Sequence, residues 1–68
     1  RDLFQVQDGQ LLAIEACEFR VVDLSGRTRM FRPLQGGQRL DLTHFNGIYL
    51  LVARTANGIQ TSKVILGE

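Results

Sequence analysis

Short apolar runs separated by turn dipeptides are the main pattern of this chain. The turns are marked by Asp8-Gly9, Ser25-Gly26, Gly36-Gly37, Asn46-Gly47 and Asn57-Gly58, where glycine or asparagine accepts a positive φ angle. The runs between them are rich in β-branched and aromatic residues and are about as long as ordinary strands. They predict strands near Leu3–Gln7, Leu11–Glu15, Phe19–Leu24, Thr28–Arg32, Gln38–Leu42, Ile48–Arg54 and Gln60–Leu66. This spacing predicts an all-β sandwich or barrel rather than βαβ units.

The alternation of apolar and polar residues indicates how these strands are buried. Gln38–Leu42 places its leucines on one face and its charges on the other, as a half-buried strand does, and Glu18–Val21 alternates in the same way. Ile48–Ala53 is apolar on both faces, which predicts a central strand covered on both sides. A single helical turn is expected at Thr43–Asn46, with its threonine as the cap.

Composition narrows the class of protein. The chain has 68 residues, of which 44% are hydrophobic and 22% charged, with a net charge of +1. A chain this short has room for one small core, so a single domain over residues 1–68 is expected. No apolar run approaches the roughly 20 residues of a membrane helix, and the balanced charge gives no reason to expect nucleic acid as a partner. The chain does not begin with methionine, and we interpret it as a fragment of a longer secreted protein.

Few residues offer reactive chemistry. Cys17 is the only cysteine, and we interpret it as a small apolar residue at a strand end, whose thiol pKa the acidic flanks raise. His44 has no histidine or cysteine partner at ligand spacing, so an exposed loop residue is favoured over a metal ligand or general base. Asp8, Asp23 and Asp41 are scattered, and Asp23 is expected to bond the backbone of its turn. No enzyme activity, metal or cofactor is expected.

Three arginines form a candidate anion site. Arg27, Arg29 and Arg32 crowd one predicted hairpin, and guanidinium groups bind phosphate and carboxylate well. However, Met30 and Phe31 lie among them, so the charges are expected to be split between two faces. Arginine on an exposed strand also blocks edge-to-edge aggregation, and the sequence favours that role.

Three segments together carry a resemblance to a known family. Each consists of a strand and an adjoining motif: Phe19–Arg27 with Asp-Leu-Ser-Gly-Arg, Leu40–Tyr49 with Asp-Leu-Thr and Gly-Ile-Tyr, and Thr61–Leu66 with a lysine before three apolar residues. In this order they resemble the C-terminal sorting domain of proteins exported by the type IX secretion system of certain Gram-negative bacteria (the Por secretion system C-terminal domain). The resemblance covers roughly Phe19 to Leu66.

The resemblance implies an immunoglobulin-like antiparallel β-sandwich of about seven strands that acts as a secretion address. The outer-membrane translocon would recognise the folded domain and carry the attached protein through the periplasm to the cell surface. A sortase-like peptidase would then remove the domain and join the passenger to anionic lipopolysaccharide, or the domain would be retained in the surface attachment machinery. The chain would be a substrate or adaptor rather than a catalyst.

The same resemblance implies the site residues. Those matched to recognition are Gly47, Tyr49, Lys63, Val64, Ile65 and Leu66, and those of the turn motif are Asp23, Ser25, Gly26 and Arg27. Tyr49 follows a corner and opens a strand, as in the tyrosine corner of immunoglobulin-like sandwiches, where the hydroxyl bonds back to the preceding connection. Leu42 and Phe45 are expected to pack beneath that corner.

One departure and two alternatives accompany this hypothesis. The family carries an Asn-Pro or Pro-x-Pro element near its first strand, whereas this chain has Phe4–Gly9 there and its one proline, Pro33, in a later connection. A divergent member, or a fragment that starts inside the domain, is therefore expected, and divergence favours retention over cleavage. The alternatives are a passive immunoglobulin-like or fibronectin-like spacer, and a module that binds an anionic glycan or lipopolysaccharide through Arg27, Arg29 or Arg32.

Overall fold

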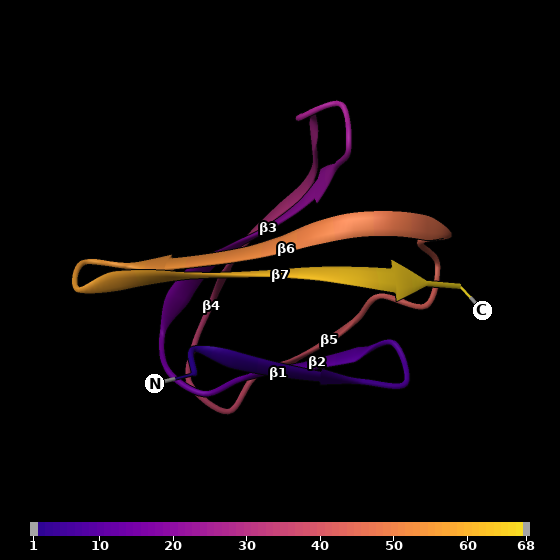
Figure 1. The fold of residues 1–68 in the computed structure, drawn as a ribbon. Coiled ribbons are helices and arrows are strands. Elements are labelled where there is room, and N and C mark those ends of the chain that lie inside the picture. Colours follow the sequence, from indigo (N-terminus) through magenta and orange to yellow (C-terminus); the bar gives the residue numbers. More distant parts are fainter. Residues whose placement is uncertain (1, 68) are drawn as a thin grey trace.

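A computed structural model describes residues 2–67, and this part of the chain forms seven antiparallel strands in two sheets (Figure 1). The strands are β1 (Phe4–Gln7), β2 (Gln10–Ala13), β3 (Cys17–Asp23), β4 (Thr28–Leu34), β5 (Arg39–Asp41), β6 (Gly47–Thr55) and β7 (Gly58–Leu66). One sheet has the order β1-β2-β5 and the other β4-β3-β6-β7. The predicted all-β, seven-stranded sandwich is confirmed.

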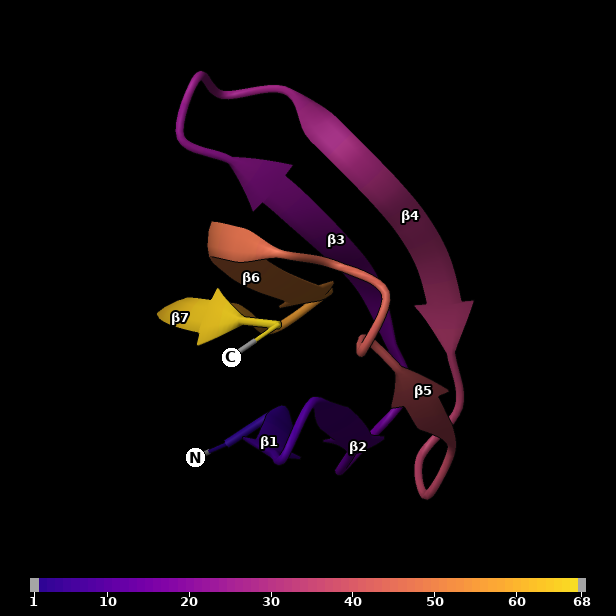
Figure 2. The same ribbon diagram turned by 90° about the vertical axis from the view of Figure 1, so that its right-hand side faces the viewer.

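The strand order follows the immunoglobulin arrangement closely. β1-β2-β5 face β3-β6-β7, as strands A, B and E face C, F and G in immunoglobulin domains. The fourth strand differs from that of a constant-type domain, because it pairs with β3 instead of joining the first sheet. Figure 2 shows the two layers, with β4 leading down to β5 where the chain crosses from one layer to the other.

The core lies between the two sheets and is wholly apolar. In β3, Cys17, Phe19 and Val21 are buried while Glu18 and Arg20 are exposed, as the alternation predicted. The rings of Phe4 and Phe19 meet edge to face with their centroids 5.8 Å apart, so they join the two sheets. The described residues include no buried polar or charged side chain. The buried residues are Leu3, Phe4, Leu11, Ala13, Cys17, Phe19, Val21, Leu34, Leu42, Phe45, Tyr49, Leu51, Ala53 and Leu66.

The outer face of β6 is open, which corrects the prediction that this strand is covered on both sides. Its inner residues Tyr49, Leu51 and Ala53 are buried, but Ile48 is 41% exposed and Leu50 is only half-buried. A two-layer sandwich has no third layer, so the face of β3, β6 and β7 turned away from the other sheet remains at the surface. We call this the outer face.

Two local predictions are wrong. Pro33 lies inside β4 rather than in a connection, because β4 is an edge strand and the missing N–H of proline is tolerated there. Thr43–Asn46 forms no helix but a single turn, closed by the Phe45 amide donating to the Leu42 carbonyl at 3.1 Å. Asp41, rather than Thr43, accepts the hydrogen bonds that fix this turn.

Cys17 and His44 occupy the places that the sequence indicated. Cys17 is buried at the start of β3, and burial first and the charge of Glu15 second raise the pKa of its thiol. The direction is as predicted, although desolvation contributes more than the acidic flank. His44 is exposed, with its ring 4.4 Å from that of Phe45.

Candidate recognition site at one end of the larger sheet

Three segments that are far apart in the sequence meet at one end of the four-stranded sheet (Figure 1). Asp23, at the end of β3, lies opposite Tyr49 near the start of β6. Tyr49 in turn lies opposite Val64 near the end of β7, and Gly47 lies opposite Leu66. The fold therefore places the turn motif, the corner motif and the lysine segment on adjacent strands.

The Asp23 turn is held by one carboxylate oxygen. Asp23 Oδ1 accepts from the Ser25 amide at 3.0 Å, the Ser25 hydroxyl at 2.6 Å and the Arg27 amide at 3.0 Å. The Gly26 amide donates to the Asp23 carbonyl at 3.0 Å, with Gly26 at a φ of 92°. These hydrogen bonds lower the pKa of the Asp23 carboxyl. The bond from the Ser25 hydroxyl has the largest effect and the bond from the Arg27 amide the next largest. The prediction that Asp23 bonds its own turn is confirmed.

Tyr49 forms the expected corner. Its hydroxyl donates to the Asn46 carbonyl at 3.3 Å, across the connection that precedes β6. The Phe45 ring meets that of Tyr49 edge to face at 5.2 Å, and Leu42 is fully buried. Gly47 turns the chain at a φ of 128°, which few other residues adopt. This corner fixes which side chains of β6 point inward.

Asp41, at the start of the connection between β5 and β6, accepts hydrogen bonds in the same way as Asp23. Asp41 Oδ1 accepts from the Thr43 amide at 2.9 Å, the Thr43 hydroxyl at 2.6 Å and Gln10 Nε2 at 3.2 Å. The bonds from Thr43 lower the pKa of this carboxyl as well. The two Asp-Leu-Ser/Thr tripeptides thus share the bonds from the carboxylate to the residue two positions later, but Leu24 is 62% exposed while Leu42 is fully buried.

The end of β7 divides the predicted recognition residues between two faces. Leu66 is buried and Val64 half-buried on the inner face, whereas Lys63 is exposed and Ile65 is 65% exposed on the outer face. Among the predicted recognition residues of β7, Lys63 and Ile65 are therefore the ones that a partner can reach. Tyr49 and Gly47 contribute indirectly, because they set the conformation of the corner before β6.

Ile48 and Leu50 join this exposed surface, which sequence reasoning missed. Ile48 lies opposite Ile65, and Leu50 lies between Lys63 and Val22 on neighbouring strands. The signal for their orientation was present in the sequence. Once Tyr49 is placed inward by its corner, the period of two along a strand turns its neighbours Ile48 and Leu50 outward. We call Val22, Ile48, Leu50, Lys63 and Ile65 the outer patch.

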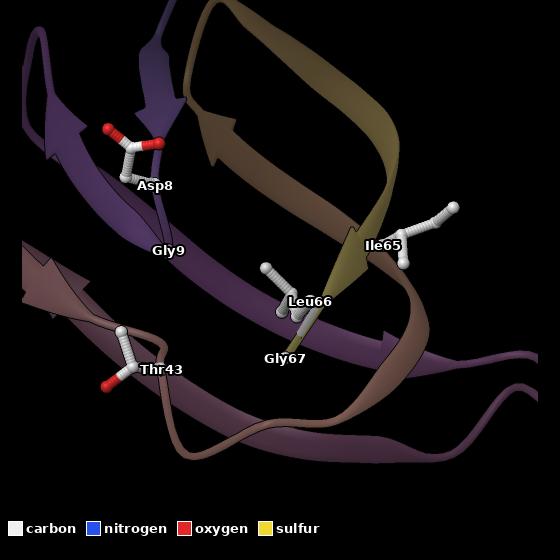
Figure 3. Close-up of a pocket in the computed structure, with 6 residues that line it drawn as sticks. All are labelled: Asp8, Gly9, Thr43, Ile65, Leu66 and Gly67. Carbon is white, nitrogen blue, oxygen red and sulfur yellow. The ribbon is translucent and has the colours of Figure 1, made fainter.

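An open hollow of about 620 Å³ lies beside this end of the sheet, lined by Asp8, Gly9, Thr43, Ile65, Leu66 and Gly67. Figure 3 shows Ile65 and Leu66 pointing to opposite sides of β7. Its lining includes one carboxylate, Asp8, and one hydroxyl, Thr43, which donates to Asp41 Oδ1 at 2.6 Å. Over residues 2–67, no three His, Cys, Asp or Glu side chains gather where a metal ion would fit.

The arginines of the β3–β4 hairpin have different partners. Arg29 Nη1 is 3.6 Å from Asp23 Oδ2, beside a bulge in the pairing of β3 with β4. Arg32 lies opposite the inward-facing Phe19, whereas Phe31 lies opposite Arg20, whose guanidinium is 4.8 Å from the centre of the Phe31 ring. Phe31 and Arg32 therefore lie on opposite faces of β4, while Arg29 is the extra residue of the bulge and Arg27 remains in the turn.

Comparisons of the chain with protein-family models, with curated proteins and with solved structures give no match. Within residues 2–67, no helix has the length and apolar character needed to cross a membrane. The functional proposal therefore depends on the sequence motifs and on where the fold places them.

Proposed function

We propose that this chain is a sorting domain, which addresses an attached protein to the type IX export machinery of the outer membrane. The observation that carries the proposal is the row Asp23, Tyr49 and Val64 across three adjacent strands. Each of these residues belongs to a different one of the three segments that resemble the sorting family. Motifs that were matched only by their order in the sequence thus come together in space at one end of a sheet.

We assign structural or partner-binding roles to the motif residues according to whether their side chains are exposed. The Asp23 turn and the Tyr49 corner stabilise the frame through their hydrogen bonds. The outer patch offers a partner one ammonium group, Lys63, among aliphatic side chains. A receptor with an acidic group inside an apolar surface would complement it. The partners would be the outer-membrane translocon and then the sortase-like peptidase, with the passenger delivered to the cell surface and joined to anionic lipopolysaccharide.

Retention of the domain at the cell surface is a further hypothesis, motivated by the absence of the proline element near β1. A retained domain would leave the mature surface protein at full length. Mass spectrometry of that protein tests this directly, and a product shorter by this domain would show cleavage instead.

An export assay tests the sorting function. Residues 1–68 are fused behind a periplasmic reporter and expressed in a host with a working type IX system and in a host without the translocon. We expect the reporter on the surface only in the first host. Reporter that stays in the periplasm of both hosts would contradict the proposal and favour a spacer or glycan-binding domain.

Paired variants of β7 test the outer patch. Lys63→Glu and Ile65→Ser change its charge and its apolar surface, and we expect each to lower surface display by about tenfold, as substitution of a central contact does. Ile59→Ser is the matched control, since Ile59 is 60% exposed on the same strand but lies at its other end. Circular dichroism confirms that all three variants fold. Equal loss of export in all three would contradict a site at this end of the sheet.

A further inference from the structure

The sandwich has four edge strands, and three of them carry features that hinder pairing with another chain. β1 and β5 have only four and three residues. β4 contains Pro33, the exposed arginines Arg29 and Arg32, and a bulge in its pairing with β3. Short length, proline, charge and bulges are the devices that prevent edge-to-edge association.

β7, the fourth edge strand, has a single charge and none of the other devices. It has nine residues, pairs with β6 in an unbroken register from Gly58 to Leu66, and carries one charge, Lys63. Ile59 and Ile65 are 60% and 65% exposed. In an antiparallel pair every second residue turns its N–H and C=O away from its partner, so β7 presents a row of free backbone groups.

We infer that β7 pairs antiparallel with β7 of a second copy of this chain, about a twofold axis at Ser62. In this register Ile59 lies opposite the second copy's Ile65, and Thr61 opposite its Lys63, each contact occurring twice. Odd-numbered residues of one copy lie opposite odd-numbered residues of the other, so the outer faces of the two sheets become continuous. The backbone N–H and C=O groups of β7 that do not bond to β6 then bond to each other. All nine residues from Gly58 to Leu66 take part.

Neighbouring registers fit less well. An axis at Lys63 sets the two ammonium groups directly opposite each other, which is repulsive. An axis at Thr61 sets Ile59 opposite Lys63 and leaves Ile65 and Leu66 beyond the second strand. Of these three registers, only the one centred on Ser62 places the exposed isoleucines opposite each other and keeps the two Lys63 ammonium groups apart. The strand is therefore complementary to itself, which favours a second copy of this chain over an unrelated strand.

Sedimentation equilibrium of the purified chain, followed from dilute to concentrated solution, measures the association. Thr61→Lys places two pairs of ammonium groups directly opposite across the axis, so we expect dimerisation to weaken at least about tenfold. Adding Lys63→Glu to that variant turns both pairs into attractive ones and restores the dimer. Gln5→Lys adds the same charge to exposed β1 and leaves the association unchanged. Chains that stay monomeric at every concentration would overturn the inference.

Crosslinking tests the register, with Cys17→Ala as the common background. Ser62→Cys forms a disulfide-linked dimer on mild oxidation, because directly opposite residues have Cα atoms about 4.5–5.5 Å apart, within the range that a disulfide spans. Thr61→Cys does not crosslink by itself but does so when mixed with Lys63→Cys. Crosslinking of Thr61→Cys alone as readily as Ser62→Cys would overturn this register. The experiments use no export machinery, so their failure leaves the proposed function untouched.

Discussion

Asp23 and Asp41 show how one residue type sets the geometry of this domain. Each carboxylate accepts the amide and the hydroxyl of the residue two positions later, and so ends a strand and starts a turn. These hydrogen bonds favour the ionised form in the folded chain and lower both pKa values below the ordinary 3.8. The two turns are therefore sensitive to acid.

The pH dependence of stability follows from these shifts. Because the folded-state pKa values lie below the unfolded value of 3.8, the stabilisation is fully present above that pH and is lost as the pH falls through the lowered values. We expect the free energy of unfolding, measured in urea, to drop over this acidic range. The double variant Asp23→Asn/Asp41→Asn should show a flatter profile. An unchanged slope would assign the acid sensitivity to other groups.

Tyr49→Phe isolates the hydroxyl of the corner. The ring contact with Phe45 stays, while the hydrogen bond to the Asn46 carbonyl is lost. We expect the free energy of unfolding to fall by about 1 kcal/mol, as for a typical internal hydrogen bond. Urea denaturation measures the change. A larger loss would mean that the carbonyl finds no water in the variant.

At the level of elements, the sequence predicted all seven strands and the order of the turns, because strand length, alternation and Gly-containing turns are local properties. It also predicted the Asp23 turn and the Tyr49 corner. It did not predict that β6 is open on its outer face. Apolar residues on that face give the same sequence pattern whether a third layer or a partner covers them. Pro33 was misplaced because edge position depends on pairing with a distant strand.

Gly67 anchors the end of β7, a role that no local pattern marked. It has a φ of 81°, and a Cβ there would lie 2.7 Å from the Phe45 carbonyl oxygen and 2.8 Å from the Asn46 Cα atom. Gly67→Ala should therefore lower the free energy of unfolding by at least about 2 kcal/mol. Gly26→Ala is the control. Gly26 also has a positive φ but open space around it, so we expect a loss of about 1 kcal/mol. Equal losses would show that the chain end moves aside.

At the level of the whole molecule, Gln60 links the two sheets by hydrogen bonds. Near the start of β7, on its inner face, its Oε1 accepts from the amides of Leu3 and Phe4, and its Nε2 donates to the Phe4 carbonyl at 3.4 Å. An exposed glutamine would be the ordinary expectation for this residue type. Only the approach of β1 to β7 across the sandwich gives it a structural role.

Gln60→Ala removes this link and leaves the Leu3 and Phe4 amides without their acceptor. We expect a loss of about 1–3 kcal/mol in the free energy of unfolding and faster hydrogen exchange at these two amides. Gln5→Ala, an exposed glutamine on β1, is the control and should change neither quantity. Unchanged exchange at Leu3 and Phe4 in Gln60→Ala would show that packing alone protects the start of the chain.

The Gln60 link also makes closure of the sandwich depend on both ends of the described chain. β1 can pair with β2 without β7, but the amides of Leu3 and Phe4 have their acceptor only when residue 60 is in place. A chain cut short before residue 60 is therefore expected to leave these two amides unpaired and its first strand more open to proteases.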